Sequence, residues 1–253
     1  GEIRSVKTGK TVSLGHHDLR IRPDDGLLEL VAGQTQFGRN RNDAGDWFGC
    51  NNSNPLWHYV LDDAALRRNP HFSPPRSIVH LPEVPGNASV FPTSVTEKRF
   101  NDFHTANCIT SACGSIIYRA SLLGKAYQGN AFICEPVHNL VHREVLATEG
   151  VTFSSRRADD EQTSEFLTST DQAFRPVAMH TAPDGSLWVV DMYREVIEHP
   201  EWIPHDREVQ LDLRAGHDRG TLYRLAPNGH VPQAMPDLTA LDHDSLVSML
   251  GHD

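Results

Sequence analysis

The chain has 253 residues, and 23 Lys and Arg against 33 Asp and Glu give it a formal net charge of -10. A surface for nucleic acid or for an anionic membrane needs concentrated Lys and Arg, so this charge argues against both kinds of partner. No apolar run approaches the roughly 18 residues of a membrane-spanning helix, so we expect no transmembrane segment in this chain.

The composition favours strands over helices. Stretches that favour helix are scarce, while 18 Gly and 16 Pro interrupt the chain. Many short strands joined by irregular loops are therefore expected. The N-terminus, Gly1–Arg4, has no Met and no signal-peptide character, so we expect a piece of a longer protein.

The expected strands begin with a hairpin. Residues His17–Ala32 form two apolar stretches around a turn at Pro23–Gly26, and Pro176–Asp191 repeats this form around Ala182–Gly185. Further strands are expected at Ser115–Arg119, Ala131–Cys134, Gly150–Ser154 and Gly220–Leu225. Units that recur at uneven intervals of about 40 to 60 residues predict an all-β fold, a β-propeller with blades of about four strands.

Long polar insertions and a helical tail complete the expected organisation. The insertions Asp62–Ser77 and Val196–Asp218 predict rim or binding loops. Apolar residues between Leu238 and Leu250 recur at helical spacing, which predicts a short C-terminal helix. We therefore expect propeller blades over residues 1–232 and, over 233–253, a linker with the start of a truncated helical-repeat region.

Two segments share one form, in which a Phe-x-Cys strand runs into a polar stretch. One is Trp47–His58 and the other is Ala131–Arg143. We expect them to be versions of one structural element. In the second segment, Glu135 and the residues up to Arg143 place an acid, two imidazoles, an amide and a guanidinium at a strand end, where a sheet opens to solvent or to a cleft.

The spacing of His138 and His142 resembles the zinc motif His-Glu-x-x-His, but Asn139 occupies the place of the general base. A carboxamide cannot accept a proton from metal-bound water, so a metal-dependent hydrolase ranks last among the candidate functions. We expect a site role for at least one of His138, Asn139 and Arg143. The alternative is a strand end whose polar groups are hydrogen-bonded to one another.

Other candidates are similarly balanced between site and structural roles. Arg39 presents a fork that suits a planar carboxylate, although a structural Asp–Arg pair is the commoner outcome. Asn52 and Asn54 are candidate ligands or simple turn formers. His104 is a candidate general base or part of a tight turn. Asp191 and Arg194 close the Pro176–Asp191 unit, with a structural ion pair as the alternative.

The four cysteines contain no Cys-x-x-Cys-His haem site. A disulfide between Cys108 and Cys113 and buried free thiols both remain open for them.

Four segments together resemble one family, the membrane-bound dehydrogenase domain of planctomycetes and related bacteria. The segments are Gly33–Arg39, Trp47–Trp57, Cys134–Arg143, and Arg175–Pro176 through Tyr193. This domain is a propeller similar to soluble quinoprotein glucose and sorbosone dehydrogenases. The resemblance covers roughly residues 1 to 230 and implies an incomplete set of blades from a six- or seven-bladed propeller. It also implies a periplasmic or membrane-associated extracytoplasmic location.

The resemblance implies oxidation of a carbohydrate or other alcohol by a quinone such as pyrroloquinoline quinone, with Ca²⁺ polarising the quinone. Electrons would pass to a c-type cytochrome domain outside this chain, which itself carries no haem. If the polar clusters of this chain carry out this chemistry, they contain catalytic, cofactor-binding and metal-binding groups. The catalytic candidates are His138, His104 and Asp191; the cofactor-binding candidates are Arg39, Asn52, Asn54, Asn139, Arg143 and Arg194; the metal candidate is Glu135. The alternative function is a non-catalytic propeller that binds carbohydrate or a protein partner as a scaffold.

Overall fold

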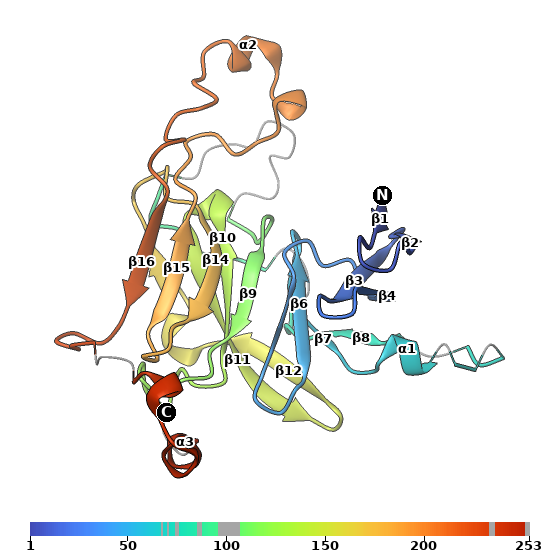
Figure 1. Ribbon diagram of the computed structural model, residues 1–253. Coiled ribbons are helices and arrows are strands. Elements are labelled where there is room, and N and C mark those ends of the chain that lie inside the picture. Colours follow the sequence, from blue (N-terminus) through green and yellow to red (C-terminus); the bar gives the residue numbers. More distant parts are fainter. Residues whose placement is uncertain are drawn as a thin grey trace.

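The computed structural model describes residues 1–66, 68–69, 71–73, 76–84, 88–95, 107–232 and 236–250. It consists of antiparallel sheets with a few short helices (Figure 1). The strands are β1 Glu2–Arg4, β2 Thr11–Ser13, β3 His17–Arg22, β4 Leu27–Ala32, β5 Arg39–Arg41, β6 Trp47–Asn51, β7 Asn54–Tyr59, β8 Ile78–His80, β9 Cys113–Ile117, β10 Ala131–Glu135, β11 Leu140–Glu149, β12 Thr152–Arg157, β13 Leu167–Thr168, β14 Pro176–Thr181, β15 Leu187–Asp191 and β16 Thr221–Leu225. The helices are α1 Asp63–Leu66, α2 His205–Glu208 and α3 His243–Met249, and 3₁₀ turns occur at Pro136–His138, Asp159–Glu161, Pro200–Trp202 and Leu238–Ala240.

The strands pair mainly with their neighbours in sequence. β1 pairs with β2 and β3 with β4, while β5 to β8 form a four-stranded sheet in sequential order. β9 to β12 form a second sequential sheet, to which β13 adds beside β11, and β14 to β16 form a three-stranded sheet. The predicted all-β class, both predicted hairpins and the C-terminal helix are confirmed. The described strands show no closed ring, and no described helix is long and apolar enough to span a bilayer.

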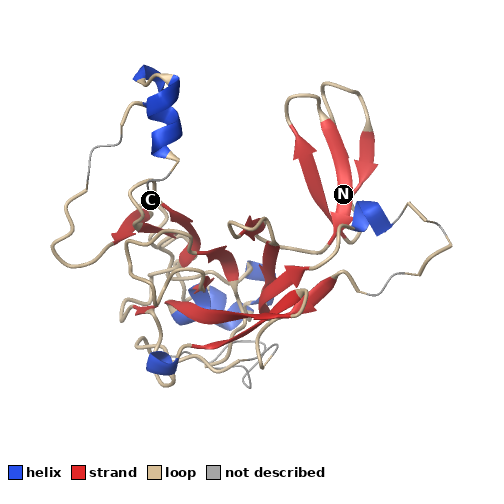
Figure 2. Ribbon diagram, turned by 90° about the horizontal axis from the view of Figure 1, so that it is seen from below, coloured by secondary structure: helices blue, strands red, loops and turns tan. Residues whose placement is uncertain are grey.

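The strands gather into several separate sheets across the molecule (Figures 1 and 2). Side chains of β10 belong to both of the two main cores, so this strand lies between them. Its Ile133 joins a core shared with the β5–β8 sheet, where it packs with Phe48 and Leu56. Its Phe132 faces the other way and joins a core with Met179 of β14. Alternate side chains of a strand point to opposite faces, so burial of both faces explains why this strand is a continuous apolar run.

The two Phe-x-Cys segments occupy equivalent places, as expected. β6 and β10 are each the second of four strands that pair in sequential order. Each also contains a shift of register, between Gly49 and Asn51 in β6 and between Phe132 and Cys134 in β10. A bulge lets a strand bend before it enters the turn that follows. Of the two alternatives for the cysteines, the structure shows free thiols at all four, three of them buried.

Gly114 lies where β9 approaches β14 of the neighbouring sheet closely. Its φ is +54°, and a Cβ added there would lie 2.6 Å from the carbonyl oxygen of Val177 and 2.7 Å from the Cα of Ala178. Gly124 also has a positive φ, +98°, but a Cβ there would meet nothing within 4 Å. Backbone strain is thus common to both positions, while the steric clash is confined to Gly114.

We expect Gly114→Ala to reduce the free energy of unfolding by about 2 kcal/mol more than Gly124→Ala, because only the first forces β9 and β14 apart. Urea denaturation of the two variants beside the parent chain measures this difference. Equal losses in the two variants would show that the close approach of the sheets has no energetic consequence.

Candidate functional site

Several predicted site residues meet where strands of the β9–β12 and β14–β16 sheets end. We name this group the loop-end cluster: Ser111, Glu135, His138, Asn139, Arg175 and Asp191. Glu135 is fully buried at the end of β10. One of its carboxylate oxygens accepts the backbone N–H of Thr110 at 3.2 Å, and both accept from the N–H of Ser111, at 2.9 and 3.2 Å. The Ser111 hydroxyl donates a further hydrogen bond at 2.5 Å, so a ring of donors satisfies the oxygens of this buried carboxyl group.

His138 belongs to the 3₁₀ turn that follows β10 and is also buried. Its Nδ1 lies 3.1 Å from Oε1 of Glu135, and its Nε2 lies 3.1 Å from the backbone nitrogen of Asn107. Since the N–H of Asn107 must donate to Nε2, the neutral tautomer carries its proton on Nδ1 and donates it to Glu135. Both ring nitrogens are therefore engaged inside the protein.

Asn139 makes the turn between β10 and β11. Its φ of 57° is left-handed, a conformation that Asn tolerates better than most residues. Its side-chain amide donates to the carbonyls of Gln172 and Phe174, at 3.0 and 2.6 Å. Asn139 thus joins the β10–β11 turn to the chain that enters β14.

Arg175 links this turn to the end of β15. Its Nη1 donates to the carbonyl of Pro136 at 2.8 Å and to that of Val137 at 3.3 Å. Its Nε and Nη2 donate to the carbonyls of Arg194 and Glu195, at 2.7 and 2.8 Å. The guanidinium is buried and satisfies carbonyls of two turns that belong to different sheets.

Asp191 joins the same cluster from β15. Its Oδ1 accepts the backbone N–H groups of Arg175 and Tyr193, both at 2.8 Å, and its buried Oδ2 has no hydrogen-bond partner among the described residues. The expected Asp191–Arg194 ion pair is wrong, because the guanidinium of Arg194 donates instead to the carbonyl of Arg214 at 3.0 Å. Arg194 contacts Arg175 through its backbone, because the carbonyl of Arg194 accepts a hydrogen bond from the guanidinium of Arg175.

His142 lies within β11 and has one carboxylate on each ring nitrogen. Its Nδ1 is 2.8 Å from Glu165 and its Nε2 is 2.9 Å from Glu144. Burial alone would lower the pKa of His142, but its hydrogen bonds with the two carboxylates raise the pKa to about 9. Arg157 pairs with Glu165 at 2.9 Å, and burial, which would raise the Glu165 pKa, is outweighed by the hydrogen bonds from His142 and Arg157, so that pKa is lowered.

Arg143 lies on the opposite face of β11, away from the loop-end cluster. Its guanidinium pairs with Asp160 and, through Nε at 2.9 Å, with Glu161, and lies 4.5 Å from the centre of the Tyr127 ring. Arg143 is thus a buried cation with two charged partners, although its Nε makes no hydrogen bond with a described residue. Among the described residues no group of three or more His, Cys, Asp and Glu side chains is arranged to hold a metal ion.

The remaining predicted residues are divided between turns and a pocket. Asn54 donates from its backbone and side chain to Oδ1 of Asn51, at 3.1 and 2.9 Å, which is a turn arrangement. The carbonyl of Asn52 accepts the N–H of Ala112 at 3.0 Å, which places this turn beside the Ser111 segment of the loop-end cluster. His104 lies outside the described residues.

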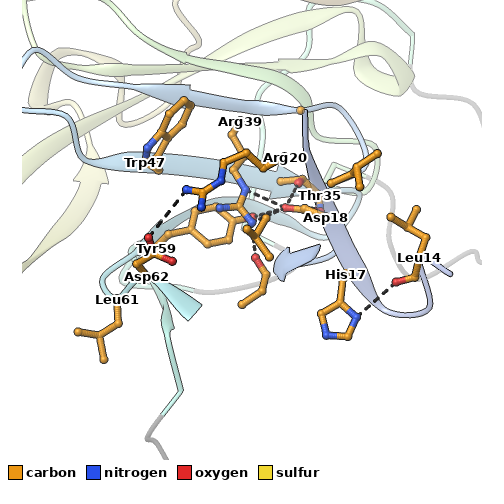
Figure 3. A pocket seen from close by; sticks show the side chains of 14 residues that line it. Leu14, His17, Asp18, Arg20, Thr35, Arg39, Trp47, Tyr59, Leu61 and Asp62 are labelled. Atoms are coloured by element: carbon orange, nitrogen blue, oxygen red, sulfur yellow. Dashed lines mark hydrogen bonds and ion pairs between the residues drawn. The ribbon is translucent and has the colours of Figure 1, made fainter. Parts of the chain in front are cut away.

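Arg39 lines a cavity of about 520 Å³ between the β3–β4 hairpin and the β5–β8 sheet (Figure 3). We name this cavity the aromatic pocket and define it by Asp18, Thr35, Arg39, Trp47 and Tyr59. Leu14, Leu19, Val31, Ala32 and Leu61 supply apolar surface around them. Trp47 is 44% exposed, and the guanidinium of Arg41 lies over its ring, 5.8 Å from the ring centre.

The floor of the aromatic pocket is held by one carboxylate. Asp18 accepts from the backbone N–H of Thr35 at 2.8 Å and from the Tyr59 hydroxyl at 3.1 Å, and pairs with Arg39 at 2.8 Å. The guanidinium of Arg39 stacks on the Tyr59 ring, 3.6 Å from its centre. Burial raises the pKa of Tyr59 to about 12, so its hydroxyl stays protonated at neutral pH.

Sequence reasoning missed Asp18, Tyr59 and Arg175. Asp18 and Tyr59 sit in strands where alternation suggests only hairpin and core residues, so no local pattern distinguishes them. Arg175 directly precedes Pro176 at the start of a strand, and its one signal is a place within a segment that carries the family resemblance. The structural Asp–Arg alternative for Arg39 is confirmed, with Asp18 as the partner.

Comparison with known proteins gives one match. A family model described as a domain of unknown function (DUF7133) matches residues 1–229, a range that includes every described strand. No curated protein and no solved structure shows significant similarity to the chain.

Proposed function

The chain belongs to the DUF7133 family, and from that premise we propose that it binds a carbohydrate or a related polyol in the aromatic pocket. The observation that carries the proposal is the partly exposed Trp47, which lines a cavity of about 520 Å³ beside the Asp18–Arg39 pair. A pocket that is mostly apolar and has a few convergent polar groups is the usual form of a small-molecule site.

The chemistry of a sugar matches both parts of this lining. The C–H groups of a pyranose ring form an apolar face that can pack on an exposed indole such as Trp47. Sugar hydroxyls accept hydrogen bonds from a guanidinium, so they suit Arg39, which Asp18 positions by accepting from Arg39, Thr35 and Tyr59. Because Asp18 and Arg39 are already fixed by Thr35 and Tyr59, binding costs little side-chain ordering.

The hydrogen bonds of the loop-end cluster favour sugar binding over sugar oxidation as the proposed function, because they occupy groups that catalysis would need. A general base needs a free lone pair, and both nitrogens of His138 are engaged with Glu135 and Asn107. A Ca²⁺ ligand needs a free oxygen, and the carboxylate of Glu135 already accepts from a ring of donors. Glu135 and His138 therefore do not fit the quinone and Ca²⁺ as arranged, and they support no catalytic step.

Quinone-dependent oxidation, electron transfer to a c-type cytochrome domain and an extracytoplasmic location remain predictions based on resemblance. Dye reduction with pyrroloquinoline quinone, Ca²⁺ and a panel of sugars is the assay for the first of them. We also propose that the sheets β5–β8, β9–β12 and β14–β16 are successive blades of a propeller. The sequential strand order and the cores shared between neighbouring sheets support this.

Trp47→Ala is expected to weaken binding of the best ligand from a panel of neutral mono- and oligosaccharides by at least about tenfold, because the stacking face is lost. Trp188 on β15 is the matched control, since it is similarly exposed, 42% against 44% for Trp47, and lies on another sheet. Isothermal titration of the parent chain, Trp47→Ala and Trp188→Ala measures the difference. Equal affinities in the parent chain and Trp47→Ala, or no sugar bound by the parent chain, would refute the proposal.

A further inference from the structure

A second cavity, of about 420 Å³, lies where the chain leaves β4 and meets β7 and β8. Its polar lining comes from separate segments: His16, Gln34, Asn51, Asn54, Arg76 and His80. We name it the donor cleft. No described residue that lines it is acidic, although the whole chain carries a net charge of -10.

Internal hydrogen bonds engage two acceptors of this cleft, Oδ1 of Asn51 and Nδ1 of His16, and leave donors on the same two residues. Oδ1 of Asn51 already accepts two hydrogen bonds from Asn54, so the free side-chain groups of Asn51 are N–H donors. Nδ1 of His16 lies 2.6 Å from Nε2 of Gln34, and when that amide donates, the neutral tautomer of His16 carries its proton on Nε2.

Two further side chains add donors without compensating carboxylates. The guanidinium of Arg76 forms no ion pair with a described carboxylate, although its five N–H groups suit an oxyanion. The ring of His80 packs edge-on against Trp57, with 5.8 Å between the ring centres, which holds the imidazole in place. The cleft therefore gathers a cation, imidazoles and amides around one space.

We propose that the donor cleft binds an oxyanion, the carboxylate or phosphate group of a small ligand. Donors from several segments that converge on one space are the requirement for oxyanion recognition, and a guanidinium supplies two of them in parallel. The inference is independent of sugar binding in the aromatic pocket, because the two cavities have no lining residue in common.

The test uses the 253-residue chain and three probes: inorganic phosphate, D-glucuronate and, as the uncharged match of the latter, D-glucose. We expect phosphate or glucuronate to bind, and Arg76→Gln to weaken that binding at least tenfold by isothermal titration. Arg219→Gln removes the same charge from the exposed 192–220 connection and is expected to leave the affinity within twofold. Arg76 is exposed, and an unchanged thermal unfolding curve verifies the fold of its variant.

The outcomes separate the sources of the anion and the two proposals. Binding of glucuronate alone assigns the site to carboxylates, binding of phosphate alone assigns it to phosphates, and either result supports the proposal. The proposal is overturned if neither anion binds, or if Arg76→Gln binds the anion as tightly as the parent chain does. It is also overturned if Arg76→Gln and Arg219→Gln lose equal affinity. Trp47→Ala is expected to retain anion binding, so a failure of the aromatic pocket as a sugar site is distinguishable from a failure of this one.

Discussion

His142→Phe is expected to lower the free energy of unfolding by about 3 to 5 kcal/mol, which is the usual cost of removing one partner from a buried ion pair. Glu144 would lose its partner, and Glu165 would keep only Arg157 as a charged partner, in a core that also holds Leu140. Urea denaturation at pH 6.5 measures the loss. His180→Phe is the control, because His180 lies exposed on β14. A loss in His142→Phe no larger than in His180→Phe would show that the charged network contributes nothing net.

The same residue predicts a dependence of stability on pH. The pKa of His142 is raised from 6.5 to about 9 in the folded chain. A raised pKa means that the folded state holds the proton more tightly, so this stabilisation is complete below pH 6.5 and is lost as the pH rises toward 9. The loss across that window is about 3 kcal/mol. His142→Gln cannot titrate, and its unfolding free energy is expected to lack this decline; parallel pH profiles of the two chains would contradict the assignment.

Arg175→Lys is expected to cost about 3 kcal/mol or more, because one ammonium cannot reach carbonyls on two turns and a buried unsatisfied carbonyl costs about 1 to 3 kcal/mol. The effect should be local as well as global. Faster amide hydrogen exchange is expected at Asn139 and Tyr193, whose turns Arg175 joins. Hydrogen exchange with mass spectrometry, beside urea denaturation, measures both consequences.

Arg194→Lys is the matched control for Arg175→Lys. The side chain of Arg194 donates to one carbonyl, that of Arg214, in an exposed setting, so the change is expected to cost less than about 0.5 kcal/mol. Exchange rates at Asn139 that are the same in Arg175→Lys and in the parent chain would exclude a role for Arg175 in joining the two turns.

Local patterns in the sequence predict much of the fold. The hairpins at β3–β4 and β14–β15 follow from apolar alternation around Pro-Asp-Gly turns, and the equivalence of β6 and β10 follows from their shared Phe-x-Cys form. Such signals lie within a few residues of one another. The order of the sheets and the absence of a closed ring among the described strands depend on contacts between distant segments, which no local pattern encodes.

The candidate site is less predictable from the sequence because the partners of its charged residues are remote. Glu135 and His138 are recognisable as a polar strand end, and they do meet in space. Their other partners, Ser111 and Asn107, come from a different loop, and this is what makes both groups internal hydrogen-bonding residues. Arg143 has the sequence position of a member of the same cluster, but the two-residue period of β11 turns it to the opposite face.

The connection that follows the second strand differs greatly among the three main sheets. It occupies residues 52–53 after β6, 136–139 after β10 and 192–220 after β15. The longest of these projects beyond the sheets together with α2 (Figure 1). The same position in the three sheets therefore holds connections of very different length, from a tight turn to a long loop, while the strands on either side remain paired. Evolution can therefore elaborate this end of the molecule, and an engineer can graft new segments there, while the packed sheets stay unchanged.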